Sequence, residues 1–146
     1  MIKRIKIDQV EPNGYKAILG LEKFIENTPL TRTHKDLIKV RASQINGCAF
    51  CIDMHTKEAR KAGETEQRIF ALNAWRDTPF FTEEERAILS LTEEVTLISN
   101  HVKDETYTAA AGLLGETYMA QVILAIITIN AWNRIGITTL LVPAKD

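Results

Sequence analysis

One stretch of the chain, residues 36–55, decides how the rest of the sequence is interpreted, and it reads DLIKVRASQINGCAFCIDMH. Its second half is a CxxCxxxH motif, which contains both cysteines of the protein, Cys48 and Cys51, and one of its three histidines, His55. Successive residues of a helix rotate by about 100°, so in a helix these three side chains project from one face. Two sulfurs then lie close enough to bond, and an imidazole lies one turn beyond Cys51.

This combination of side chains suits thiol redox chemistry. A thiolate is the nucleophile in such reactions, and a second thiol resolves the oxidised product. Cys48 lies in the first turn of the expected helix, where free backbone N–H groups and the helix dipole stabilise an anion. Cys51 lies one turn further in, where the dipole helps less, so it needs a base. His55, four residues further on, is placed to serve as that base.

The motif also has other interpretations. A structural zinc site needs four nitrogen or sulfur ligands, and the motif supplies three. Asp53 would point away from this face, so His34 or His101 would have to complete such a site. The cysteines could instead be inert core residues, and His55 could merely pack within its helix. A thioredoxin-like site needs a βαβ context, whereas this neighbourhood is helical. No motif implies a metal, flavin or haem, so we expect no cofactor.

The sequence on both sides of the motif predicts an all-α bundle of about six to seven helices. Apolar residues recur at helical spacing, and only the ends of the chain hint at a period of two. Residues 82–85, Thr-Glu-Glu-Glu, form a capping box that opens one of the helices. The expected helices cover about residues 15–26, 31–45, 48–62, 65–75, 82–98, 104–114 and 116–134.

The 146 residues are expected to form a single domain with irregular ends. Residues 1–14 are predicted to be an extended or irregular N-terminal arm, with a turn at Pro12-Asn13-Gly14. Gly136 is expected to end the last helix, and residues 137–146 to form a C-terminal tail, either a strand or an arm that packs on a neighbour. The last helix is apolar almost all round, which indicates the centre of the bundle or a subunit interface. We therefore expect a homo-oligomer.

Composition and charge indicate which classes of partner and which cellular compartment to expect. The net charge is −1 and no block of Lys or Arg stands apart from acidic neighbours, so nucleic acid is not an expected partner. The longest apolar stretch, residues 122–129, is too short to span a bilayer, and the start lacks the features of a signal peptide, so no membrane association is expected. Two cysteines at CxxC spacing argue against a structural disulfide framework and favour the reducing cytoplasm.

Several polar residues outside the motif are expected to have structural roles. Arg41 is expected to belong to a buried ion pair. Asn130 and Asn133 are expected to form a packing and helix-contact cluster with the indole of residue 132. His34 and His101 lie in polar surroundings and are expected at the surface.

Residues 36–59, which extend the quoted stretch by Thr56-Lys-Glu-Ala59, resemble the core of the carboxymuconolactone decarboxylase superfamily. More narrowly, they resemble its alkylhydroperoxidase D-like (AhpD-like) branch. The resemblance continues through residues 72–76 (LNAWR), 82–87 (TEEERA) and 129–134 (INAWNR), so it covers most of the chain. It implies an all-helical fold and a thiol-dependent, peroxiredoxin-type peroxidase activity on hydroperoxides in antioxidant defence. It also implies an external dithiol or reductase as the reductant, and dimers, trimers or hexamers.

The resemblance implies roles for four residues. In the family the second cysteine attacks the peroxide and becomes a sulfenic acid, which the first cysteine resolves to a disulfide. Carried over, Cys51 is the peroxidatic cysteine and Cys48 the resolving one. His55 matches the histidine of the family's proton relay. The family's glutamate, twelve residues before the first cysteine, falls on Asp36, which is the expected orienting carboxylate for His55.

The chain departs from the family pattern at two positions. Asp36 is one methylene shorter than the family glutamate, and it could equally be a solvated helix residue. Phe50 stands between the cysteines where the best-known peroxidases of the family carry a histidine. Two other functions therefore stay open. One is a redox-sensing or stress-related protein without fast turnover, whose disulfide switches an interaction. The other is a decarboxylase or lactone-acting enzyme on the same fold, which would keep its activity without Cys48.

Overall fold

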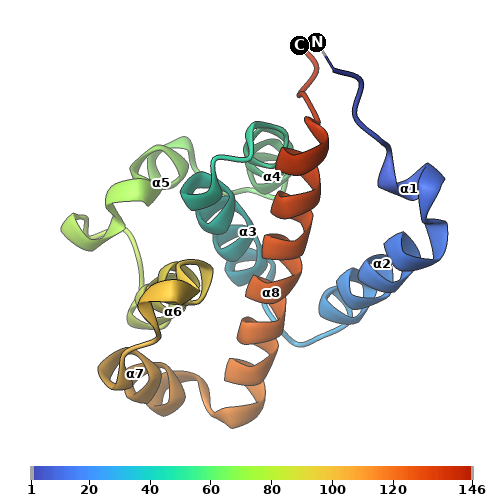
Figure 1. Cartoon of the computed structure of the whole chain (residues 1–146). Coiled ribbons are helices and arrows are strands. Elements are labelled where there is room, and N and C mark those ends of the chain that lie inside the picture. The colour runs from blue at the N-terminus through green and yellow to red at the C-terminus, as the bar shows by residue number, and fades with distance from the viewer. Residues whose placement is uncertain (1, 146) are drawn as a thin grey trace.

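The computed structural model describes residues 2–145, and these residues form helices and connecting segments without a strand. The six helices of at least seven residues confirm the predicted all-α bundle (Figure 1). The elements are α1 (Ile7–Val10), α2 (Pro12–Glu26), α3 (Arg32–Asn46), α4 (Ala49–Lys61), α5 (Glu66–Ala71), the 3₁₀ helix η1 (Leu72–Asp77), α6 (Glu83–Thr96), the 3₁₀ helix η2 (Ile98–Asn100), α7 (Asp104–Leu114) and α8 (Glu116–Thr139).

The long helix α8 runs through the middle of the molecule, as its apolar sequence predicts (Figure 1). It packs against α2, α3, α4, α6 and α7. By length and composition alone, α8 would also be able to cross a membrane, with a mean hydropathy of 1.3. A core helix that packs against its neighbours meets the same criteria, and 44% of the apolar window of α8 is buried inside the bundle.

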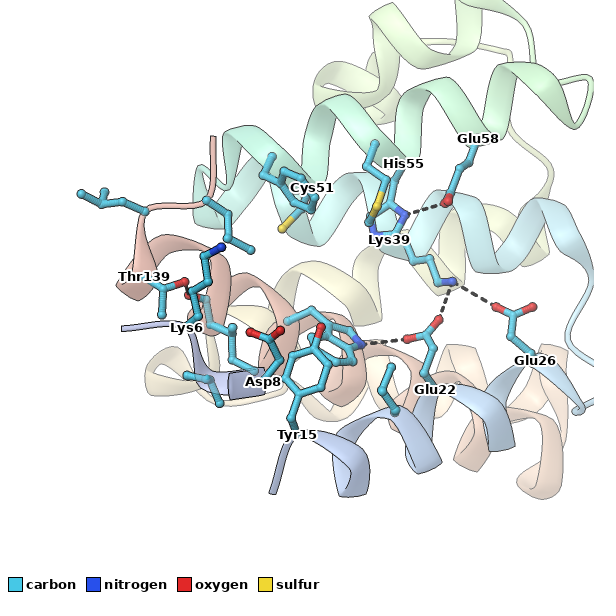
Figure 2. A pocket seen from close by; sticks show the side chains of 18 of the residues that line it. Lys6, Asp8, Tyr15, Glu22, Glu26, Lys39, Cys51, His55, Glu58 and Thr139 are labelled. Carbon is cyan, nitrogen blue, oxygen red and sulfur yellow. Dashed lines mark hydrogen bonds and ion pairs between the residues drawn. The ribbon is translucent and has the colours of Figure 1, made fainter. Parts of the chain in front are cut away.

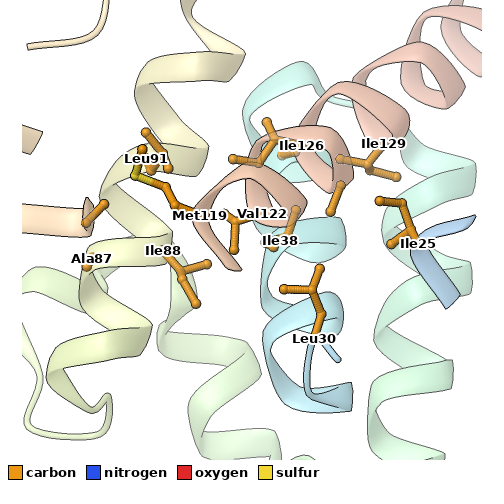
Figure 3. Close-up of a cluster of buried hydrophobic side chains, with 13 residues drawn as sticks. Ile25, Leu30, Ile38, Ala87, Ile88, Leu91, Met119, Val122, Ile126 and Ile129 are labelled. Atoms are coloured by element: carbon orange, nitrogen blue, oxygen red, sulfur yellow. The ribbon is translucent and has the colours of Figure 1, made fainter. Parts of the chain in front are cut away.

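Helix α3 is held on two sides by separate groups of buried apolar side chains. Ile38 and Ala42 belong to the main core, which also includes side chains of α2, α6, α7 and α8 (Figure 3). Leu37 and Val40 belong to a second group, in which they meet Leu72, Trp75, Phe81 and Leu89. A fully buried aliphatic side chain contributes roughly 1.5–3 kcal/mol. The two groups of buried side chains therefore fix α3, and with it the turn that leads into α4.

The turn from α3 into α4 places the first cysteine. Gly47 ends α3 in the left-handed conformation, with φ of 69°, which suits glycine because it lacks a Cβ. The next residue, Cys48, is the N-cap of α4, and its backbone N–H donates to the carbonyl of Ser43 at 3.1 Å.

The expected N-terminal cap of α6 is present as well, since Thr82 and Glu85 form a complete capping box.

A buried amide cluster ties the end of α3 to α8. The side-chain amide of Asn46 donates to Asn130 at 3.0 Å and to Asn133 at 2.9 Å. Asn133, which is fully buried, donates in turn to the hydroxyl of Ser43 at 3.0 Å. The predicted helix-contact role of Asn130 and Asn133 is confirmed, and the cluster fixes α3 next to the cysteine turn.

The predicted extended or irregular arm of residues 1–14 is wrong in its second half. Residues 7–10 form α1, and α2 begins at Pro12. Proline is favoured at the first helical position because its φ already suits a helix and its missing N–H would have no partner there. The sequence Pro12-Asn13-Gly14 therefore starts a helix instead of making a turn.

The predicted end of the last helix at Gly136 is also wrong. Helix α8 continues to Thr139, and only residues 140–145 of the predicted tail are free of helix. Gly136 lies inside α8, where a Cβ atom would be 3.1 Å from the sulfur of Cys48. Its role is thus to make room for a neighbouring side chain, and the helix pays a small entropic cost for it.

Two predictions about polar residues have different outcomes. Arg41 forms the expected ion pair, since its guanidinium lies 2.9 Å from Glu93. His101 is exposed as expected, but His34 is buried, with 8% of its surface exposed. Its Nδ1 lies 2.6 Å from the hydroxyl of Tyr118, so a side chain from α8 replaces the water that the polar sequence around His34 suggested.

Candidate active site

Cys48 and Cys51 are joined in a disulfide at the start of α4, with their Cα atoms 5.3 Å apart. The structure therefore describes the oxidised form, and it confirms that the motif brings the two sulfurs together. Both residues are buried, with 2% and 3% of their surfaces exposed. Within residues 2–145, no group of three or more His, Cys, Asp or Glu side chains is arranged to hold a metal ion.

The backbone of α8 lies directly against this disulfide. A Cβ atom on Gly136 would be 3.1 Å from the sulfur of Cys48 and 3.6 Å from that of Cys51. The shorter of these contacts is tighter than an ordinary van der Waals contact, so a methyl group here would push the sulfur of Cys48 aside. The glycine therefore allows the two sulfurs to pack onto the central helix of the bundle.

A cavity of about 1150 Å³ opens beside the second cysteine (Figure 2). Cys51 and His55 line it, whereas Cys48 does not. Its apolar lining comes from α2, α4, α8 and the C-terminal segment, and consists mainly of Leu19, Phe50, Met54, Trp132, Ile135, Leu140 and Leu141. Residues 4–8 of the N-terminal segment close another side. Cys51 is therefore the sulfur that faces the space in which a small organic molecule could bind.

His55 lies four residues beyond Cys51 on the same helix and is buried, with 6% of its surface exposed. Its Nδ1 lies 3.0 Å from Oε2 of Glu58. Burial lowers the pKa of His55, and the charge of Lys39 acts in the same direction, while the hydrogen bond to Glu58 opposes them. The imidazole is thus neutral at pH 7 and able to accept a proton.

Asp36 is buried, but it does not make the expected hydrogen bond to His55. Both of its carboxylate oxygens accept hydrogen bonds from Nε of Arg32, at 2.9 and 2.8 Å. Burial raises the pKa of Asp36, and the Arg32 guanidinium partly offsets this. The carboxylate hydrogen-bonded to His55 is that of Glu58, so the predicted pairing of Asp36 with His55 is corrected. Arg32, one turn earlier on α3, engages the short Asp36 side chain instead.

The sequence analysis missed Glu58, although a signal for it exists. Glu58 follows His55 by three residues, a spacing that places two side chains side by side on a helix. It also lines the cavity, as His55 does. The family pattern places the carboxylate on the preceding helix, at Asp36, whereas in this chain the carboxylate hydrogen-bonded to His55 comes from α4 itself.

A group of charged side chains lines the same cavity and joins three helices. Nζ of Lys39, on α3, lies 2.7 Å from Glu22 and 3.0 Å from Glu26, both on α2. Glu22 also accepts a hydrogen bond from the indole of Trp132, on α8, at 3.0 Å. Burial alone would lower the pKa of Lys39, but its two carboxylate partners outweigh this and raise it. The group holds α2 in place as a wall of the cavity (Figure 2).

This charged group was not predicted because it assembles only in three dimensions. Tyr15 extends it, since its ring contacts that of Trp132 edge to face at 5.2 Å between centroids. Its members come from helices separated by up to about a hundred residues, and no local spacing connects them. Lys39 and Trp132 lie in segments that resemble the family, but nothing in the sequence indicates that both reach Glu22.

Comparison with known proteins places this architecture in a family. The model of the carboxymuconolactone decarboxylase family matches residues 12–94, which include the CxxC motif and His55. The uncharacterized protein YdfG of Bacillus subtilis (strain 168) is 46% identical over 138 residues, which make up 94% of each chain.

Two solved structures have the same fold. The Agrobacterium tumefaciens protein ATU0492, of unknown function and assigned provisionally to the antioxidant defence protein AhpD, is 36% identical, with a TM-score of 0.93 over 99% of this chain and 100% of that one. The AhpD core of an uncharacterized peroxidase-related protein from Ralstonia eutropha JMP134 is 19% identical, with a TM-score of 0.79 over 94% of this chain and 74% of that one. The chain therefore has an AhpD-like fold and belongs to the carboxymuconolactone decarboxylase family.

Proposed function

We propose that this protein is a cysteine-based peroxidase that reduces hydroperoxides by forming and reopening the Cys48–Cys51 disulfide. The observation that carries the proposal is the position of Cys51. It is bonded to Cys48, precedes His55 by one turn of α4, and lines a cavity large enough for an organic molecule. The similarity to ATU0492, which is linked to antioxidant defence, adds support.

The proposed reaction begins with the two cysteines as thiols. His55 takes the proton of Cys51, and the thiolate attacks the distal oxygen of the hydroperoxide ROOH. The O–O bond breaks, Cys51 becomes a sulfenic acid, and the leaving RO⁻ takes the proton from His55 to give ROH. The sulfur of Cys48 then attacks the sulfenic sulfur, and the hydroxide that leaves combines with the thiol proton of Cys48 to give water.

The two electrons that reduce the peroxide come from the two thiols, so the disulfide must be reduced before the next turnover. An external dithiol or a reductase supplies these electrons by two successive thiol–disulfide exchanges. Such dithiols are maintained in the reducing cytoplasm, which is the compartment we propose for the protein.

We further propose that the protein works as a homo-oligomer. Several large apolar side chains near the two ends are exposed, among them Ile2, Ile5, Val10, Leu140, Leu141 and Val142. Apolar surface gathered in this way is typical of interaction sites. Light scattering coupled to size-exclusion chromatography should give a mass that is a multiple of 16.5 kDa, and a monomer at micromolar concentration would contradict this proposal.

The enzymatic proposal is tested by peroxide consumption with dithiothreitol as reductant. We would compare hydrogen peroxide with cumene hydroperoxide, using the wild type, Cys51→Ser and Cys48→Ser. Cys51→Ser should reduce turnover to the uncatalysed background because it removes the attacking sulfur. Cys48→Ser should allow one stoichiometric reaction and accumulate a sulfenic acid on Cys51, which dimedone labelling with mass spectrometry would detect.

The other functions give different results in the same experiment. A wild-type protein that opens and closes its disulfide but consumes no peroxide would support a redox switch and contradict the peroxidase. A decarboxylase or lactone-acting enzyme would show no dependence on the dithiol and would keep its activity in Cys48→Ser. Circular dichroism of each variant would show that the helices remain folded.

A further inference from the structure

Two carboxylates on neighbouring helices compete for the role of His55's partner, and they make different contacts. Oε2 of Glu58 lies 3.0 Å from Nδ1 of His55. Asp36 instead accepts two hydrogen bonds from the single Nε of Arg32, at 2.9 and 2.8 Å. Glu58 lines the cavity together with Cys51 and His55, whereas Asp36 does not.

The contact to Glu58 decides what each ring nitrogen of His55 can do. A carboxylate only accepts hydrogen bonds, so Nδ1 carries the proton that it donates to Glu58. In the neutral imidazole the other nitrogen, Nε2, is then unprotonated and free to take a proton. In Figure 2 the imidazole lies between Cys51 and Glu58, so the carboxylate is on the side of the ring away from the sulfur.

We propose that Glu58 is the positioning residue of the proton relay. Its carboxylate fixes the tautomer and orientation of His55, so that Nε2 of His55 takes the proton of Cys51. This inference deepens the proposed peroxidase function and rests on it for the step in which the proton moves. A carboxylate that orients a catalytic histidine also stabilises the imidazolium that forms when the histidine accepts a proton. In this chain that carboxylate comes from α4 itself, one turn beyond the histidine.

The exposure of Glu58 gives the relay a connection to solvent. Its side chain is 48% exposed, whereas that of His55 is 8% exposed. A proton held on the buried imidazole therefore has a polar neighbour that reaches water. Besides Glu58, the charges of Lys39 from α3 and Glu22 from α2 act on His55, and these two are paired with each other at 2.7 Å. Glu58 is thus the one carboxylate hydrogen-bonded to His55 within residues 2–145.

The test compares substitutions of the two competing carboxylates in two measurements. The first is nitrogen NMR of the His55 ring in the oxidised protein, which reports the tautomer and the pKa and requires no turnover. Glu58→Ala should lose the predominance of the Nδ1–H tautomer, and Glu58→Gln should lower the pKa of His55 because it removes a negative charge. Asp36→Asn should leave both unchanged.

The second measurement is the rate at which iodoacetamide alkylates reduced Cys51, recorded against pH in a Cys48→Ser background. Without Glu58 the imidazolium is less stable, so less thiolate forms at neutral pH. Glu58→Ala should lower the rate at pH 7 by roughly 10-fold and move the profile towards higher pH. Glu58→Gln should retain part of the rate because its amide oxygen can still accept the hydrogen bond from Nδ1.

Asp53→Asn is the matched control. Asp53 is a carboxylate on the same helix, partly exposed and paired with Lys57 at 3.0 Å, and it is not among the residues that line the cavity. If the Glu58 variants behave like Asp53→Asn, or if Asp36→Asn alone changes the tautomer and the alkylation profile, the inference is overturned. A protein with the expected NMR and alkylation results but no peroxide turnover would contradict the peroxidase proposal and leave the positioning of His55 by Glu58 established.

Discussion

Two polar groups adjoin the cysteine motif, and they differ in charge. The first is the amide cluster of Ser43, Asn46, Asn130 and Asn133, in which uncharged side chains hydrogen-bond one another between α3 and α8. The second is the charged group of Glu22, Glu26 and Lys39, joined to Trp132, which lines the cavity with Cys51 and His55.

The amide cluster holds the cysteine motif in place, whereas the charged group lies beside the residues that would react. A neutral, fully hydrogen-bonded cluster does not titrate, so it keeps its geometry as pH or redox state changes. A charged group beside a cavity changes the pKa of its neighbours and responds to what binds there. The disulfide therefore has a rigid support at the end of α3, while its base, His55, is surrounded by groups that titrate.

The largest effect is expected from Lys39→Met, which breaks the charged group. The change leaves Glu22 and Glu26 facing each other without their cation, in a partly buried place. Loss of one partner from such a pair costs about 3 kcal/mol, and the measurement is the free energy of unfolding in urea. The pKa of His55 should rise, because the charge of Lys39 lowers it in the wild type.

Lys16→Met on α2 is the control, since Lys16 is exposed. It should change the free energy of unfolding by less than about 0.5 kcal/mol. Equal effects of the two substitutions would show that the charged group does not hold α2 against the bundle.

A smaller but clear loss is expected from Asn133→Ala in the amide cluster. The substitution removes one of the two acceptors of Asn46 and the donor to Ser43 in a fully buried place. We expect a cost of about 2 kcal/mol in the free energy of unfolding, with little change in the pKa of His55. The exposed Asn73→Ala is the control. A shift of the His55 pKa as large as that in Lys39→Met would remove the distinction between the two groups.

The sequence predicted the parts of the site that depend on local spacing. The CxxCxxxH motif predicted that Cys48, Cys51 and His55 lie together at the start of one helix. Cys51 and His55 lie on α4, Cys48 is its N-cap, and all three are buried. Local spacing could not show that Arg32 engages Asp36 and leaves His55 to Glu58, because the outcome depends on which of several carboxylates lies within reach after α3 and α4 have packed.

The bundle itself was predictable for the same reason, since amphipathic periodicity and capping residues are local signals. The errors lie where one signal has two meanings. Pro12 marks either a turn or a first helical turn. Gly136 marks either the end of a helix or a close approach of another side chain, and only the packed structure shows the sulfurs against it.

Gly136→Ala tests that close approach and should have an intermediate effect. The new Cβ would lie 3.1 Å from the sulfur of Cys48, so the oxidised protein should lose about 1–2 kcal/mol through overpacking. Gly112→Ala in α7 is the matched control, because no atom lies within 4 Å of its Cβ position. That substitution should stabilise the protein by about 0.5–1 kcal/mol, as expected for alanine in a helix. Equal stabilisation by both would mean that the sulfurs move away from α8 at little cost.

The smallest effect concerns pH and compares His34 with His55. Burial lowers the pKa of both below its ordinary value of 6.5. The unfolded chain therefore binds more protons than the folded protein below about pH 6.5, and stability falls as pH falls through that range. Asp36, whose pKa is raised by burial, acts in the opposite direction, since its contribution to stability is lost as pH rises.

Between pH 7.5 and 5.5 the wild type should thus lose roughly 1 kcal/mol of its free energy of unfolding, measured in urea at each pH. His34→Gln should remove part of this slope without touching the cavity, because His34 packs against Tyr118 and not beside Cys51. The exposed His101→Gln should leave the slope as it is. A slope that survives in His34→Gln and disappears in His55→Gln would place the whole pH response at the base beside the disulfide, and would make oxidised-state stability a direct readout of His55 protonation.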